Sequence, residues 1–332
     1  MPSKKLRILV VFEVPRKPEL PLKDYLKLPD WEDERDVVRT LKSLGHEVLM
    51  VGIGPEINPL ITMIQQEKPD LIFNLCETLN KNRKQEPNIA GICELFNIPY
   101  TGASPFALHL CQDKAMQKKI LSYGKIKTPQ FQVVSKNEKK PNLNHLSYPV
   151  IIKPLNLEAS EGISQKSYAQ TPGACLQRIS FIQKKFNSDI IVEEYIDGTD
   201  IYAAVMGNNK IIVGHPIELV FSHYPEKRKK IATYKTKWDD AYRKKWGIRT
   251  HPLKNKELAQ SVKKICKKIY SELKISGYAR FDLRASPQRG LFFIEANPNP
   301  SIAKEDDFSK SVKAIGFSYK EILQKIIYSS LH

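Results

Sequence analysis

Short apolar runs alternate with amphipathic stretches along the chain, and this alternation is typical of α/β proteins. In the first third of the chain the runs predict strands and the stretches predict helices, with strands at residues 7–12, 47–52, 70–74 and 98–102 and helices at 33–44 and 89–96. Strands that alternate with helices usually pair in parallel. We therefore expect an N-terminal parallel sheet with covering helices.

The pattern changes after this first lobe. A helix over residues 105–123 is followed by strands at 130–134 and 150–152, which suggests a small lobe. The remaining elements are mostly strands, at 190–195, 202–206, 211–213, 277–283 and 291–295, with helices at 257–273 and 319–329. We expect this last sheet to be largely antiparallel. The predicted domains are an N-terminal α/β domain at 1–110, a small central lobe at 111–190 and a C-terminal lobe at 191–332.

Composition agrees with a multidomain globular protein. The 332 residues are 41% hydrophobic and 27% charged, and no tract is repetitive or compositionally disordered. Glu13 and Pro15 interrupt the N-terminal apolar run, which makes it too short for a signal peptide. No run approaches the ~18 apolar residues that span a bilayer, so we expect a cytoplasmic protein. Five scattered cysteines without CxxC spacing indicate reduced thiols and no structural zinc.

The chain carries a formal charge of +17. Such a balance is compatible with binding to nucleic acid, with attraction of an anionic nucleotide, or with a lysine-rich solvated surface. The basic residues form short clusters, such as residues 227–230, without a recognisable nucleic-acid-binding signature. We therefore favour the solvated surface and expect no nucleic-acid partner.

Residues 278–298 predict a hairpin that gathers polar side chains on one face. Side chains alternate across a strand, so Arg280 shares a face with Asp282, and Glu295 shares one with Asn297. Carboxylate and amide oxygens, together with phosphate oxygens, suit a magnesium ion. A solvent-exposed polar face explains the same pattern equally well.

Two lysines occupy positions that suit a phosphate group. Lys114 lies in a predicted helix, and Lys153 ends a buried strand. The loop at residues 155–164, which contains Ser160, has small residues whose backbone N–H groups can surround phosphates. An isolated lysine more often lies along apolar surface, so that alternative stays open.

Glu193, Glu194 and Ile196 stand at the end of another strand, and Asp200 follows closely. Acids and backbone groups at such a position can bind an adenine edge and a ribose between apolar walls. Taken alone, an ordinary strand and turn is the preferred interpretation of this segment.

The order of these motifs resembles the ATP-grasp superfamily, and specifically the D-alanine-D-alanine ligases, over residues 69–327. Each motif is weak by itself, and the ordered set is specific. It comprises residues 70–74, 98–102, 113–114, 150–154, 193–198, 234–238, 279–282 and 295–300. The resemblance implies an ATP-grasp fold, with an N-terminal pre-ATP-grasp domain and two α+β lobes that clasp ATP.

The same resemblance implies a role for each matching position. ATP contacts would come from Lys114, Lys153 and Ser160 at the phosphates and from Glu193, Glu194, Ile196 and Asp200 at the adenosine. Catalytic contacts would come from Lys237 at the γ-phosphate and from Arg280 and the backbone N–H of Ser301 at the developing oxyanion. Magnesium, with manganese as the alternative ion, would be held by Asp282, Glu295 and Asn297.

The implied reaction needs no protein nucleophile. A carboxylate attacks the γ-phosphate to form an acyl phosphate, and an amine then displaces phosphate to form an amide or peptide bond. We expect small-molecule partners, namely a carboxylate and an amine such as an amino acid or peptide, and no membrane partner. A homodimer is an open alternative for the assembly. A second hypothesis is an ATP-binding regulatory or nucleic-acid-associated module without turnover, although the intact phosphate and metal positions speak against it.

The chain departs from the family pattern where substrates should bind. Residues 12–16 replace a glycine-rich turn, and Glu77 stands where these ligases usually carry histidine. Ala159 and Asp306 each stand where a serine is usual. An acid at position 306 would repel a substrate carboxylate. A different amino acid, a peptide, or an amine without a free carboxylate therefore fits better than two molecules of D-alanine.

Overall fold

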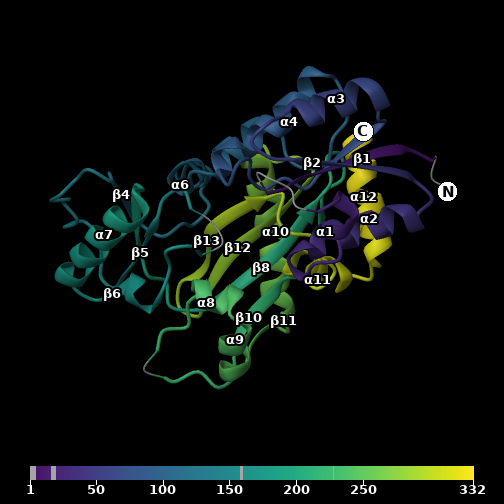
Figure 1. Ribbon diagram of the computed structural model, residues 1–332. Coiled ribbons are helices and arrows are strands. Elements are labelled where there is room, and N and C mark those ends of the chain that lie inside the picture. The colour runs from purple at the N-terminus through teal and green to yellow at the C-terminus, as the bar shows by residue number, and fades with distance from the viewer. Residues whose placement is uncertain (1–4, 16–19, 158–159, 227) are drawn as a thin grey trace.

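The computed structural model describes residues 5–15, 20–157, 160–226 and 228–332. Three β-sheets follow one another across the molecule (Figure 1). The largest sheet occupies the middle, the small four-stranded sheet projects to one side, and the N-terminal lobe packs at the other end, near the C-terminal helices.

The N-terminal sheet is parallel, with strand order β2-β1-β3, as the sequence predicts. Its strands are β1 (Arg7–Glu13), β2 (Glu47–Ile53) and β3 (Leu71–Asn74), and its helices are α1 (Leu22–Tyr25), α2 (Glu32–Ser43), α3 (Asn58–Glu67) and α4 (Glu86–Leu95), with 3-10 turns η1 (Pro29–Trp31) and η2 (Arg83–Gln85). β1 is central and therefore apolar on both faces, because helices cover both sides of a parallel sheet. The strand expected at residues 98–102 is reduced to a single bridge between Ile72 and Tyr100.

The prediction of one helix over residues 105–123 is wrong. The chain forms α5 (Pro105–Cys111) and α6 (Lys114–Tyr123), and the helical path is interrupted between them. Asp113 has extended backbone angles and its carboxylate accepts hydrogen bonds from the N–H groups of Ala115 and Met116, at 2.8 and 2.9 Å. Aspartate is a favoured N-cap residue, so it starts a new helix here. This break sets the direction in which Lys114 points.

The small sheet has strand order β4-β7-β5-β6. Its elements are β4 (Phe131–Val134), β5 (Val150–Pro154), β6 (Tyr168–Ala169), β7 (Ile190–Glu194), the turn η3 (Gln165–Ser167) and helix α7 (Pro172–Phe186), which packs on the sheet. β7 crosses the boundary that we expected at residue 190, and it pairs with β5 and β4. The exact domain limits stay a prediction.

The large sheet is antiparallel in all the pairings that join its strands, as expected. Its strands are β8 (Thr199–Met206), β9 (Ile212–Val213), β10 (Ile217–Phe221), β11 (Ile248–Pro252), β12 (Tyr278–Ser286) and β13 (Gly290–Pro298). The accompanying helices are α8 (Tyr234–Trp238), α9 (Asp240–Trp246), α10 (Lys256–Glu272), α11 (Asp307–Lys313) and α12 (Tyr319–Leu331). The hairpin β12–β13 lies where the large sheet faces the small lobe (Figure 1).

One close contact fixes the N-terminal lobe against the end of β13. The Asn299 side chain accepts a hydrogen bond from the Ala103 N–H at 2.8 Å. Gly102 has φ +102°, and a Cβ there would lie 2.3 Å from Asn299 Oδ1. Only glycine permits both that backbone conformation and that approach. The contact brings the ends of the N-terminal strands to the polar hairpin.

All five cysteines are buried and free, which confirms the prediction of reduced thiols in the core. Within the described ranges, no helix is both long and apolar enough to cross a bilayer.

Candidate active site

The predicted polar hairpin is present, and the four predicted residues face one another in pairs. Arg280 on β12 lies opposite Asn297 on β13, and Asp282 lies opposite Glu295. The strand register shifts directly after Asp282, as in a β-bulge. Bulges often lie beside active sites because they change the direction of a side chain. The hairpin therefore brings two carboxylates, an amide and a guanidinium together.

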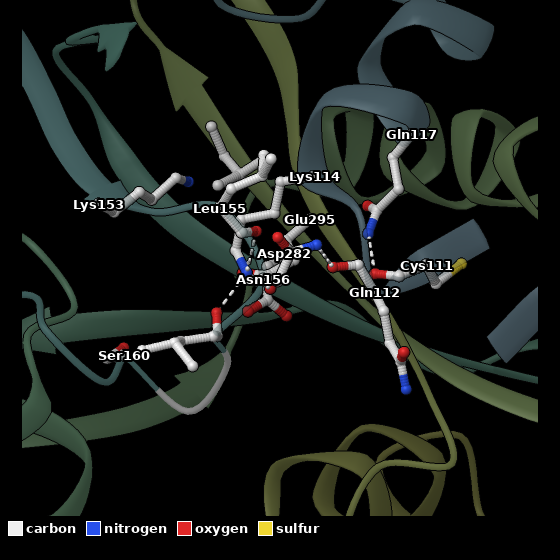
Figure 2. Close-up of polar contacts among 12 residues, drawn as sticks. Cys111, Gln112, Lys114, Gln117, Lys153, Leu155, Asn156, Ser160, Asp282 and Glu295 are labelled. Atoms are coloured by element: carbon white, nitrogen blue, oxygen red, sulfur yellow. Dashed lines mark hydrogen bonds and ion pairs between the residues drawn. The ribbon is translucent and has the colours of Figure 1, made fainter. Parts of the chain in front are cut away.

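Each hairpin carboxylate has its own cation. Lys114 Nζ lies 3.0 Å from Glu295 Oε1, and Arg280 binds Asp282 with two hydrogen bonds of 2.8 and 3.2 Å. Burial alone would raise the pKa of Glu295, but Lys114, Lys153 and other cations lower it to about 2. Figure 2 shows Lys114, Glu295 and Asp282 pointing toward one another. Glu295 is therefore ionised and ready to accept a metal ion or another cation.

The second predicted lysine belongs to a buried charge cluster around Glu193. Lys118 and Lys153 each approach a different oxygen of the Glu193 carboxylate, at 2.9 Å. All three side chains are almost completely buried. Burial acts to raise the pKa of Glu193, but the two lysines hold it below its ordinary value. Two cations on one buried anion leave a net positive charge at this point of the cleft.

An apolar pocket opens beside this cluster. Its walls combine the side chains of Ile151, Ile163, Ile196, Ile231 and Ile294 with the polar groups of Lys153, Glu193, Glu194 and Asp200. A flat aromatic base fits between aliphatic walls of this kind, with polar groups at the rim. The Ser160 hydroxyl donates to the Ala232 carbonyl at 2.9 Å, so the described end of the phosphate loop lies at this pocket.

Asp200 and Glu194 are both held by arginines that the sequence did not indicate. Arg284 lies 2.6 Å from Asp200 and also donates to the Ile196 carbonyl. Arg289 donates to Glu194 at the more exposed edge. Asp200 Oδ2 is buried and has no hydrogen-bond partner among the described residues. That oxygen is available to a ligand hydroxyl, as the predicted ribose contact requires.

A polar cleft of about 180 Å³ opens where the hairpin meets the N-terminal lobe. It is lined by Arg280, Asn297, Ser301 and Lys237, among others. Burial and the charge of Arg280 lower the pKa of Lys237. An anion that enters the cleft would therefore stabilise the protonated amine of Lys237. The structure brings the three predicted catalytic residues, Lys237, Arg280 and Ser301, to one cavity.

The donor set at the hairpin fits magnesium or manganese bound together with phosphate. Within the described part of the chain, no three His, Cys, Asp or Glu side chains converge on a metal position. Asp282 and Glu295 with the Asn297 amide oxygen instead offer an oxygen-rich partial shell. Mg²⁺ typically completes such a shell with substrate phosphates and water.

Two residues that complete the site were missed by the sequence interpretation. Lys118 follows Lys114 by one helical turn, so the i, i+4 spacing could have indicated a shared face. Arg284 follows Asp282 by two positions on β12, which places both on the same side of the strand. Four residues of the segments discussed from the sequence, Arg16, Glu158, Ala159 and Lys227, lie outside the described residues.

Comparison with known proteins identifies the family. Residues 119–328 match the family model described as the D-ala D-ala ligase C-terminus, which is more than half of the chain. The chain belongs to this ligase family. It is therefore an ATP-dependent ligase that forms carbon–nitrogen bonds, and the ATP-grasp fold is confirmed.

Members of this ligase family resemble the chain over nearly its whole length. The D-alanine–D-alanine ligase of Carboxydothermus hydrogenoformans is 28% identical over 307 residues, which cover 89% of this chain and 91% of that protein. The solved D-alanine–D-alanine ligase of Bacillus anthracis complexed with ATP aligns with a TM-score of 0.72 at 21% identity, covering 98% of this chain and 97% of that one. The VanG D-Ala:D-Ser ligase of Enterococcus faecalis gives 0.72 at 20% identity, covering 99% and 100%. The structural likenesses show the shared fold.

Proposed function

We propose that this ligase uses ATP to convert a carboxylate substrate into an acyl phosphate, which an amine substrate then attacks to form an amide. The β12–β13 hairpin carries the proposal, because its residues line both the apolar pocket and the polar cleft. A nucleotide base in the pocket would direct its phosphates toward Lys153 and Lys114 and on to the cleft at Arg280. The reacting groups would then meet beside Asp282 and Glu295.

The roles follow from position and charge. Lys114, Lys153 and Lys237 supply positive charge to phosphate oxygens, and Arg280 with the Ser301 N–H stabilises the oxyanion formed when the amine attacks. Glu193 and Asp200 hold the base and ribose. Mg²⁺, with Mn²⁺ as the alternative, would be held by Asp282, Glu295 and Asn297 and would neutralise phosphate charge. Glu194 and Ile196 would offer backbone contacts to the base, and Ser160 would cover the phosphates.

The proposed substrates differ from those in the relatives' names. Glu77 and Asp306 both line the polar cleft. The Asp306 carboxylate opposes a second carboxylate on the amine substrate, whereas Glu77 already pairs with Arg83 at 2.6 Å. An amine without a free carboxylate therefore suits the cleft better than D-alanine. We place the reaction in the cytoplasm, where ATP is supplied, and a homodimer stays an open prediction.

The test is ADP release by the purified protein with Mg²⁺ and ATP, across a panel of D- and L-amino acids, short peptides and amines. Mass spectrometry of the products identifies any new amide. We expect ADP and a new amide only when one particular acid and one particular amine are both present. If ATP binds but no acid and amine pair in a broad panel raises ADP release above background, the ligase reaction proposed here is wrong.

A further inference from the structure

Arg284 on β12 is a buried arginine in the wall of the apolar pocket. The strand register places it directly opposite Asp200 on β8. Its guanidinium lies 2.6 Å from Asp200 Oδ1, so two opposite charges face each other across adjacent strands. A guanidinium is costly to bury, and the partners of its N–H groups therefore show what it does at this place.

The three guanidinium nitrogens of Arg284 all donate to oxygens of the protein. Nε donates to the Ile196 carbonyl at 2.5 Å, and Nη1 donates to Asp200 Oδ1 at 2.6 Å. Nη2 donates to the Tyr195 hydroxyl at 3.1 Å and to the Lys230 carbonyl at 2.9 Å. The rigid planar fork of arginine can serve such a divergent set of acceptors, which a single ammonium group cannot. Arg284 therefore acts by holding its neighbours in place.

The acceptors of Arg284 come from three segments that meet at one end of the apolar pocket. Tyr195 and Ile196 follow β7, Asp200 lies at the start of β8, and Lys230 precedes α8. Residues 231 and 232, which come directly after Lys230, form part of the pocket wall. One buried side chain thus fixes three parts of the wall relative to one another.

The segment at residues 230–234 is held at two points. Arg284 binds its first carbonyl, that of Lys230. Further along, the Ala232 carbonyl accepts from the Ser160 hydroxyl at 2.9 Å, and the N–H of residue 234 donates to the Ile163 carbonyl at 3.2 Å. The phosphate loop therefore anchors one end of the segment, and Arg284 anchors the other end beside Asp200.

Asp200 keeps one oxygen free in spite of this network. Its side chain is 13% exposed, and its Oδ2 is buried without a hydrogen-bond partner among the described residues. An arginine and a carboxylate that only stabilise a fold often pair through two parallel hydrogen bonds. Here Nη2 of Arg284 is directed to Tyr195 and Lys230, and Oδ2 receives no such bond. A buried acceptor without a partner is unfavourable, and a ligand donor would satisfy it.

We propose that Arg284 is a positioning residue that makes the nucleotide pocket selective for a ribose hydroxyl. It occupies Oδ1 of Asp200 and leaves Oδ2 to accept a hydrogen bond from the 2′- or 3′-hydroxyl of the nucleotide. Because it also holds the Lys230 carbonyl, the wall at residues 231 and 232 is formed before the nucleotide arrives, which lowers the cost of binding. The inference rests on the proposed nucleotide placement of the ligase function and deepens it.

Calorimetric titration of the full chain with ADP, 2′-deoxyADP and 3′-deoxyADP, each with Mg²⁺, tests this selectivity without turnover. We expect ADP to bind about tenfold more tightly than at least one of the two deoxynucleotides, because a hydrogen bond to a carboxylate is stronger than one between neutral groups. Equal affinity for all three nucleotides would overturn the proposal, since Asp200 would then accept no ribose hydroxyl.

Arg284→Lys and Arg289→Lys form a matched pair of variants. Each keeps a positive charge and loses the planar fork, but Arg289 binds Glu194 at the more exposed edge of the pocket. We expect Arg284→Lys to lower the ADP-to-deoxyADP affinity ratio to about twofold, and Arg289→Lys to keep the wild-type ratio. An unchanged ratio in Arg284→Lys, or an equal fall in both variants, would overturn the proposal. Thermal unfolding is the companion measurement, because a purely structural arginine would lower the melting temperature and leave the ratio unchanged.

Tyr195→Phe decides the question if Arg284→Lys does not fold. It removes one acceptor of Arg284, keeps the aromatic ring and leaves no charge unpaired. Arg284 would then hold Asp200 less firmly, so the affinity ratio should fall by about threefold. A wild-type ratio in this variant would contradict the positioning role.

Product analysis separates failure of this inference from failure of the ligase reaction. A new amide formed by a protein without ribose selectivity would sustain the ligase and overturn the role of Arg284. Ribose selectivity that falls in Arg284→Lys, in a protein that forms no amide with any acid and amine pair, would overturn the ligase reaction and leave the role of Arg284 standing.

Discussion

The two ends of the cleft use carboxylates in opposite ways. At the nucleotide end, Glu193, Glu295 and Asp200 each have a lysine or arginine within about 3 Å, and the pKa values of Glu193 and Glu295 are lowered. In the cavity of about 560 Å³ that adjoins the polar cleft, burial raises the pKa values of Asp33 and Glu34. The first set is neutralised within the protein and holds the site in shape. In the second set, burial outweighs the hydrogen bond from Ser301 to Asp33 and the charge of Arg35 near Glu34.

The largest expected effect comes from removing an acid of the paired set at the hairpin. Glu295→Ala should reduce ADP release by about a thousandfold or more, since it removes a proposed metal ligand beside the reacting phosphate. The fold should persist, because the Lys114 amine still donates to the carbonyls of Leu155 and Leu157. Steady-state ADP release and circular dichroism measure the two quantities. Unchanged turnover in a folded variant would refute the metal site, and Glu56→Ala serves as the control.

Two neighbouring glutamates provide a sharper test of what burial adds to an ion pair. Glu193→Gln leaves two buried lysines without their anion, which should cost about 3 kcal/mol in the free energy of unfolding. Glu194→Gln breaks only the pair with Arg289, which is half exposed, and should cost less than about 1 kcal/mol. Chemical denaturation of both variants measures the difference. Similar losses would mean that the Glu193 cluster contributes no more than a surface pair.

Asp306→Asn should weaken the electrostatic repulsion between the polar cleft and a carboxylate on the substrate. Asparagine keeps an oxygen that can accept the Ser301 hydrogen bond, and it removes the charge. We expect the KM for an amine that carries a free carboxylate to fall by about tenfold relative to the wild type. The KM for ATP should stay the same, because Asp306 does not line the nucleotide pocket. A fall in both KM values would indicate a general rearrangement of the cleft.

The sequence predicted the parts of this site that depend on local order. Strand alternation placed Arg280 with Asp282, and Glu295 with Asn297, on shared faces, whereas their pairing across the hairpin depends on the register shift after Asp282, which the sequence did not predict. The parallel and antiparallel sheets also followed from local patterns. The ordered motifs supported the family resemblance, which the family comparison then confirmed.

Partners that come from distant segments were beyond local patterns. Glu193 meets Lys118 only because α6 packs beside β7 and β13, and the side chains are 75 positions apart in the chain. The cavity of about 560 Å³ beside the polar cleft likewise needs the end of β1, the start of α2 and the loop before α11 to meet in space. In the sequence, the acids at the start of α2 look like an ordinary helix N-terminus. The wrong prediction of one helix over residues 105–123 has a local cause. The capping side chain of Asp113 starts a new helix and interrupts a continuous helical pattern.

The smallest expected effect is a pH dependence of the free energy of unfolding, which the raised pKa of Asp33 causes. The pKa of Asp33 is raised from 3.8 to about 8 in the folded chain, so the folded state keeps a proton that the unfolded state has lost between those values. Stability should therefore fall as pH rises through this window, and Asp33→Asn should remove that part of the fall. At pH of about 8 we expect the variant to be more stable than the wild type, and near pH 4 the difference should vanish.

Thermal unfolding of both proteins across this pH range measures the effect. A variant that is less stable than the wild type throughout the range would mean that Asp33 is already satisfied within the protein. In that case Asp33 would be structural, as the paired acids at the nucleotide end are.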